Sequence, residues 1–167
     1  NIYYLMGFAV LLVSGLLLII LSLDILSSPW VLTVATLIPL GISIGLVEEY
    51  FPKWKKIYKW FAVVGFLAIA IGSIGEIELL RTIAVPVFHG VAGLVILLVP
   101  FLAKKTPKGF FWVGIGGLLI GIGGILLAFT NPGNSLGFID KDFVTLVLTP
   151  VLFLMTGAFA LGFAKKG

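Results

Sequence analysis

Six long apolar stretches divide the chain, and short polar segments separate them. The stretches cover residues 2–23, 30–50, 58–78, 82–103, 109–130 and 143–164. A helix of about 20 residues crosses the hydrocarbon core of a bilayer, so each stretch is long enough to be a span. The first is also longer than the apolar part of a secretory signal peptide, which is about 7–15 residues. The pattern predicts an all-α membrane protein with six transmembrane helices, which form three helical hairpins in a single domain over residues 1–167.

Composition supports this class and leaves little chain outside the spans. Hydrophobic residues make up 60% of the 167 residues, and the mean hydropathy is +1.25, well outside the range of soluble domains. The longest connection, residues 131–142, is too short to fold alone. Any chemistry is therefore expected within the membrane or at its two rims.

The positive charges alternate from one connection to the next. Nine of the eleven Lys and Arg residues follow the second, fourth and sixth stretches, whereas Arg81 and Lys141 fall on the other side. Short loops rich in Lys and Arg stay cytoplasmic, so both termini are expected in the cytoplasm. The net charge of +4 is then an insertion signal and not a nucleic-acid footprint. We expect the lipid bilayer as the partner, no nucleic acid, and the plasma membrane of a prokaryote as the location.

Small residues recur in the odd stretches and proline recurs in the even ones. Gly65 and Gly72 of the third stretch match Gly114 and Gly121 of the fifth at one constant offset. The even stretches contain Pro39, Pro86 and Pro150. We interpret this as a degenerate three-fold repeat of a two-helix unit.

Glycine faces let membrane helices approach closely. In the fifth stretch, a rotation of about 100° per residue puts Gly114, Gly117, Gly121 and Gly124 on one face, with Gly116 and Gly123 roughly opposite. We expect this helix to be packed from two sides. Remaining glycine faces would serve a homo-oligomer or partner membrane subunits.

Weakly polar stripes run along the even helices and are the candidate solute path. The same rotation gathers them as Thr36, Pro39 and Ser43 in the second, Thr82, Pro86, His89, Gly93 and Pro100 in the fourth, and Thr145, Thr149 and Thr156 in the sixth. We expect these stripes to converge on an axis that the glycine-rich odd helices buttress.

His89 is the single histidine and lies near the bilayer midplane. An ionisable residue there is a functional-site hypothesis, because charging it in hydrocarbon is costly. Pro86 removes a backbone hydrogen bond nearby, which leaves room for water or a solute. The alternatives are a neutral ring hydrogen-bonded to a threonine or a freed carbonyl, a pH-sensing or solute-contacting ring, and a metal or haem ligand.

Charged residues gather at both rims. Glu48 and Glu49 end the second stretch beside a lysine cluster, where ion pairing competes with a gate or an acidic partner site. Glu76, Glu78 and Arg81 crowd the third connection. There we expect a Glu78–Arg81 contact local to a turn, because the two residues should not share one helix, or else an outer vestibule that concentrates cations.

Signatures of enzymes are absent from the chain. It has no HExxH motif, no paired aspartates for phosphate chemistry and no cysteine. We therefore expect no enzymatic activity, no catalytic residues, no metal and no cofactor.

Residues 8–46, FAVLLVSGLLLIILSLDILSSPWVLTVATLIPLGISIGL, resemble the opening hairpin of the HdeD family of small six-span membrane proteins. The shared pattern is a small residue in the first helix, a short turn containing Asp, and an apolar helix ending in small residues. The resemblance implies a membrane protein of acid stress and carries over no functional residue.

Two functional hypotheses follow. The first is a passive channel or facilitator for a small neutral solute, pH-gated through His89, because a hydroxyl-rich and uncharged lining suits such a solute. The second is a non-catalytic subunit or stress-related interaction protein without transport activity of its own.

Overall fold

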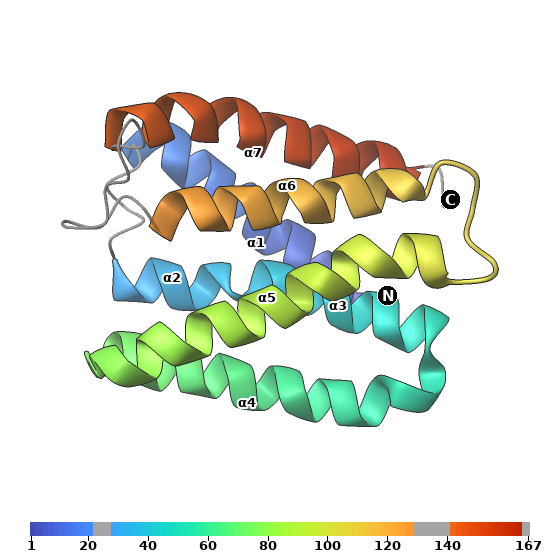
Figure 1. Ribbon diagram of the computed structural model, residues 1–167, viewed down its shortest axis with the longest axis horizontal. Coiled ribbons are helices and arrows are strands. Elements are labelled where there is room, and N and C mark those ends of the chain that lie inside the picture. Colours follow the sequence, from blue (N-terminus) through green and yellow to red (C-terminus); the bar gives the residue numbers. More distant parts are fainter. Residues whose placement is uncertain (22–27, 129–140, 165–167) are drawn as a thin grey trace. The chain divides into compact units, whose positions relative to one another are not determined.

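The computed structural model describes residues 1–21, 28–128 and 141–164, and the side chains of 124–128, 141, 142 and 145 lie outside this description. The described chain is helical and contains no β-strand. Its elements are α1 (Ile2–Leu21), α2 (Pro29–Ala35), α3 (Leu37–Tyr50), the 3₁₀ turn η2 (Pro52–Trp54), α4 (Lys55–Ile74), α5 (Glu78–Leu102), α6 (Phe111–Ala128) and α7 (Lys141–Ala164) (Figure 1).

The helices have the length and composition of membrane spans. Among the described residues, five stretches qualify: Ile2–Leu21, Pro29–Tyr50, Pro52–Ile74, Glu78–Leu102 and Leu146–Ala164. Phe111–Gly123 is a shorter apolar helix. Every predicted stretch overlaps one of these helices, so the all-α, multi-pass membrane class is confirmed.

Large apolar side chains cover the outer surface. Ile19 is 82% exposed and Phe153 is 78% exposed. A soluble monomer does not display so much apolar surface. These side chains have the environment expected of residues that face lipid tails.

The chain forms two compact units, residues Asn1–Val95 and Ile96–Gly167. The boundary falls inside α5, so its first part belongs to unit 1 and its last turns belong to unit 2. The single domain over residues 1–167 stays a prediction.

Unit 1 is built around α3, in which every residue from Ile38 to Val47 is buried. On one side α1 packs against it at glycines: a Cβ at Gly41 would lie 3.1 Å from the backbone nitrogen of Gly7. On another side, Leu40 and Ile44 form a core cluster with Ala62 of α4 and Ala92 of α5. Helix α3, with Gly41 and Gly45 four residues apart, is thus the centre of the unit.

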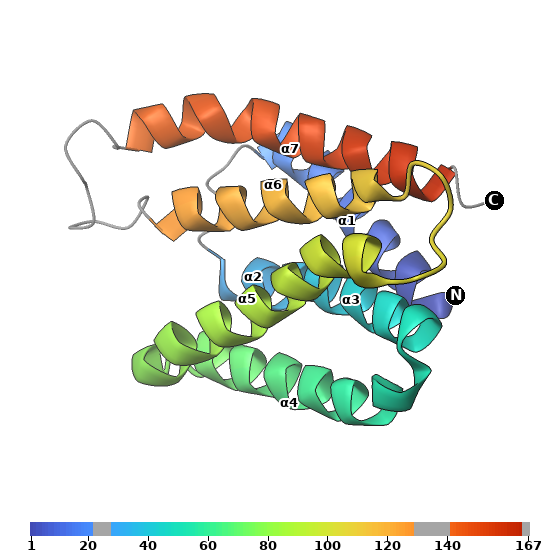
Figure 2. The same ribbon diagram turned by 45° about the vertical axis from the view of Figure 1, so that its right-hand side comes forward.

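Helices α4 and α5 form an antiparallel hairpin, and both views show them side by side (Figures 1 and 2). The ring of Phe88 occupies the space that a side chain at Gly65 would need, and the backbone of Arg81 lies against Gly72. Glu76 turns the chain with a φ of 55°. This register places Phe88 opposite Gly65 and Arg81 opposite Gly72.

The second predicted span, residues 30–50, is one span with a local break in its helical hydrogen bonding beside Thr36, which itself keeps helical angles (φ −58°, ψ −26°). Helix α2 ends at Ala35 and α3 begins at Leu37, with Thr36 between them. Pro39 explains the break, because proline has no N–H for the carbonyl four residues earlier and its ring crowds that carbonyl. The proline was noted in the sequence, but the position of the break was not predicted.

Unit 2 contains α6 and α7 side by side (Figures 1 and 2) with the last turns of α5. A Cβ at Gly117 would lie 2.8 Å from the backbone nitrogen of Leu97, and one at Gly116 would lie 2.5 Å from the Phe159 ring of α7. Gly123 also faces α7, at Leu148. The prediction that this helix is packed from two opposite faces is confirmed at these positions.

Candidate functional site

Three buried polar atoms of unit 1 make no hydrogen bond of standard geometry among the described residues, although Ser43 lies close to the Tyr58 side chain and the Val85 backbone lies close to the His89 ring. The three atoms are the hydroxyl of Tyr58, Oγ of Ser73 and Nδ1 of His89. A buried polar group without a partner costs about 1–3 kcal/mol. Such groups are usually satisfied by water or by a ligand. These three atoms therefore define the candidate functional site.

The three groups lie at three depths along the α4–α5 hairpin. Tyr58 and Ser73 are both on α4, and their positions in the sequence put them about 22 Å apart along its axis. Because Phe88 faces Gly65, His89 lies at a depth between them. The Phe61 and Phe88 rings, with centroids 4.8 Å apart, pack next to this level. The site is a spaced series of single polar groups in apolar surroundings.

His89 is half-buried, and Gly90, which follows it on α5, is exposed. A Cβ at Gly90 or at Gly93 would meet no atom of the described chain within 4 Å. A neutral imidazole in this position can accept or donate one hydrogen bond at each nitrogen. The neutral ring can therefore hydrogen-bond a small polar solute.

The threonine partner expected for His89 is not found among the described contacts. Thr36 Oγ1 donates to the carbonyl of Leu32 at 2.9 Å, and Ser43 Oγ donates to the carbonyl of Leu40 at 3.0 Å. Both hydroxyls thus satisfy their own helix. Thr36, Pro39 and Ser43 are buried, as expected of residues that line a path. However, the hydroxyl hydrogens of Thr36 and Ser43 point at backbone carbonyls of their own helix.

The predicted stripes of the other two even helices are more exposed. Thr82 and Pro86 of α5 are exposed, whereas Gly93 is half-buried. Thr149 and Thr156 of α7 are exposed as well, and Thr156 donates to the carbonyl of Leu152 at 2.9 Å.

The side chain of Thr145 lies outside the described residues. Within unit 1, His89 is half-buried, and Thr82 and Pro86 of its stripe lie on the surface.

Tyr58 and Ser73 were not among the residues predicted from the sequence. Tyr58 lies seven residues before Gly65, and Gly72 lies seven after it, so these three positions share one face of α4. Ser73 follows Gly72 directly and is fully buried. The glycine heptad marks the inward face, so polar residues on or beside it could have been identified.

At the rim where α3 ends, the acidic side chains form an ion pair and hydrogen bonds. Glu48 Oε1 pairs with Lys59 Nζ at 2.6 Å, and Glu48 Oε2 accepts from Asn1 at 3.1 Å. The Lys59 ammonium also sits 4.7 Å from the centroid of the Tyr3 ring. Glu49 accepts a hydrogen bond from the Tyr4 hydroxyl at 3.1 Å. The geometry is that of the ion-pairing alternative.

At the opposite connection, Glu76, Glu78 and Arg81 are exposed. The expectation that Glu78 and Arg81 cannot share a helix is wrong, since α5 begins at Glu78 and contains both. The helix starts earlier than predicted because Glu76, with its positive φ, completes the turn within a few residues.

Among the described residues, no three His, Cys, Asp or Glu side chains come together as a metal site would require. The absence of a metal and of a cofactor stays a prediction. The chain matches no protein-family model, no curated protein sequence and no solved structure.

Proposed function

We propose that the protein is a passive channel or facilitator for a small neutral polar solute. The observation that carries the proposal is the series of unpartnered polar groups, Tyr58, His89 and Ser73, at successive depths of unit 1. Single hydrogen-bonding groups spaced along apolar walls hold a solute weakly at each point. Weak, repeated binding is what conduction requires.

The route is closed in this conformation. Between Tyr58 and Ser73 the inward face of α4 carries Ala62 and Ile69, which are 2% and 0% exposed. Passage therefore needs α5 to separate from α4. No atom of the rest of unit 1 lies within 4 Å of a Cβ at Gly90 or Gly93, so unit 1 does not hold this face of α5 in place.

His89 is the proposed gate. A histidine has an ordinary pKa of about 6.5, so acid protonates it. A charged ring is unfavourable between apolar helices and draws in water. Tyr58 of α4 is a titratable residue that packs against the core cluster containing Ala92 of α5. We expect the acidic state to favour the open hairpin.

The proposal includes a topology and a location. The protein has six spans in three hairpins, related as a degenerate three-fold repeat. The lysine-rich loops are cytoplasmic by the rule that such loops stay inside, and both termini then lie in the cytoplasm. The membrane is the plasma membrane of a prokaryote. The likeness of residues 8–46 to the HdeD family supports a role in acid stress, and no enzymatic step is included.

The experiment is solute flux into proteoliposomes at about pH 5 and about pH 7.5, on either side of the ordinary histidine pKa. Wild type should pass small neutral solutes faster at the lower pH, and His89→Ala should lose that dependence. Tyr58→Phe and Ser73→Ala remove one hydroxyl each and should slow flux. The control, Thr33→Val, removes a hydroxyl that lies outside the predicted stripes and already donates to the Pro29 carbonyl of its own helix. Equal flux through empty and protein-containing vesicles at both pH values would rule out the channel.

A second candidate function is that of an interaction protein. It is favoured by the hydroxyls of Thr36 and Ser43, which satisfy their own helices, and by small residues on the face of α5 that unit 1 leaves open. A homo-oligomer or partner membrane subunit would cover that face. The chain has no cysteine, so His89→Cys separates the two functions. Modification by a water-soluble reagent supports the channel, and protection supports the interaction protein.

A further inference from the structure

The turn from α3 into α4 carries a dense group of cations and aromatic rings. We define the basic turn as residues 50–60, YFPKWKKIYKW. Lys53, Lys55 and Lys56 are exposed, whereas Lys59 is paired with Glu48. Three ammonium groups within four residues are therefore presented outward.

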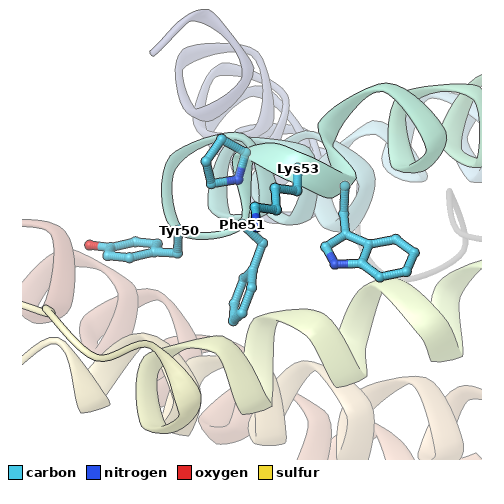
Figure 3. Close-up of a pocket in the computed structure, with 5 residues that line it drawn as sticks. Tyr50, Phe51 and Lys53 are labelled. Carbon is cyan, nitrogen blue, oxygen red and sulfur yellow. The ribbon is translucent and has the colours of Figure 1, made fainter.

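Two shallow pockets lie on the basic turn. One is lined by Tyr50, Phe51, Pro52, Lys53 and Trp54, and the Tyr50 and Phe51 rings project from the turn in different directions (Figure 3). The other is lined by Lys56, Lys59, Trp60 and Val63.

Their volumes are about 240 and 220 Å³. Pockets that enclose drug-sized ligands measure about 300–1,000 Å³. These depressions suit a group that rests against the surface.

The exposed rings place this surface at the edge of the bilayer. Trp54 and Trp60 are 61% and 64% exposed, and α4, a span by length and composition, begins at Lys55. Tryptophan concentrates at membrane interfaces, where its ring sits at the level of the headgroups. The exposed lysines beside it are thus within reach of lipid phosphates.

We propose that the basic turn binds the phosphate of an anionic phospholipid headgroup, with Lys53, Lys55 and Lys56 as its cations and Trp54 resting at the acyl boundary. The lipid is chosen because the turn joins two membrane helices and carries complementary charge at headgroup depth. This surface is independent of His89 and goes beyond the proposed function.

The other lysine-rich loop provides a matched control. Lys104, Lys105 and Lys108 are also exposed, so three lysines can be neutralised there with the same change in net charge. Its tryptophan, Trp112, is half-buried and stacks on Phe111 with ring centroids 5.2 Å apart. If charge alone determined lipid binding, the two loops would bind anionic lipid equally. The proposed site predicts stronger binding at the basic turn.

The test is quenching of single tryptophans by lipids with brominated chains. Trp54 is kept in one variant and Trp112 in another, with the remaining tryptophans changed to phenylalanine. Both are reconstituted with brominated phosphatidylglycerol or brominated phosphatidylcholine. We expect phosphatidylglycerol to bind next to Trp54 roughly tenfold more tightly than phosphatidylcholine, since each lysine near the surface contributes to anionic lipid binding.

Neutralisation then locates the site. Changing Lys53, Lys55 and Lys56 to Gln should abolish the preference at Trp54, and the same change at the control lysines should leave it intact. Equal quenching of Trp54 by both lipids would overturn the proposal, and that measurement needs no lysine variant to fold. A preference that falls equally with either triple change, or that is as large at Trp112, would also overturn it.

Discussion

At the scale of single residues, glycine decides how closely α1 approaches α3. A Cβ at Gly41 would lie 2.8 Å from the carbonyl oxygen of Tyr3, and a backbone atom cannot move aside as the end of a side chain can. In a membrane, helix association depends on such close van der Waals contact, because lipid tails provide no hydrophobic drive between helices. Gly41 is therefore a packing requirement.

We expect Gly41→Ala to destabilise the protein by about 1–3 kcal/mol, the usual cost of overpacking. The control is Gly15→Ala on α1, where a Cβ meets no described atom within 4 Å. That change should leave stability unchanged or raise it slightly, since glycine weakens a helix. Thermal unfolding in detergent measures both, and equal melting temperatures for the two variants would contradict the packing argument.

The Glu48–Lys59 ion pair should matter less than the glycine contact. Its side chains are 28% and 33% exposed, so water and salt screen the attraction. Glu48→Gln should lower the melting temperature by less than Gly41→Ala does. Raising the salt concentration should shrink the difference from wild type, and a difference that grows with salt would show that the pair is not screened.

At the scale of elements, α6 is held by two neighbours within unit 2. Gly117 faces the last turns of α5 and Gly116 faces α7. A larger side chain at either position would therefore clash with the neighbouring helix. Gly121 lies one turn beyond Gly117 and meets no described atom within 4 Å. The two glycines look alike in the sequence and differ in their surroundings.

We expect Gly117→Ala to weaken unit 2, because its Cβ would lie 2.8 Å from the backbone nitrogen of Leu97. Gly121→Ala, on the same helix, should be neutral or stabilising. Hydrogen exchange of the α6 amides should report faster opening in the first variant alone. The same exchange rates in both would mean that α6 tolerates the added methyl group on either face.

At the scale of the whole molecule, the lysine-rich loops predict the topology. The absence of cysteine allows single cysteines to be placed at Lys55, Lys105 and Glu78 without background. A membrane-impermeant thiol reagent added to intact cells should label Glu78→Cys but not the other two, which should react only after lysis. Labelling of Lys55→Cys in intact cells would reverse the proposed orientation.

The features that the sequence predicts best are those that depend on a single helix. The apolar stretches, the break-prone Pro39 and the two glycine faces of α6 follow from length and rotation about one axis. The same reasoning placed Glu78 and Arg81 on separate elements, because it could not tell that the chain turns as early as Glu76. It also treated Thr82 like Thr36, although the first is exposed and the second is fully buried.

Hydrophobic length and charge placement are properties of the chain itself, so they establish a multi-pass helical membrane protein before any packing is known. The candidate site is of another kind. Tyr58, Ser73 and His89 become a set because α4 pairs with α5 in one register, which buries three polar atoms without partners. Which side chains are enclosed depends on contacts between residues far apart along the chain, and apolar stretches that look alike do not specify those contacts.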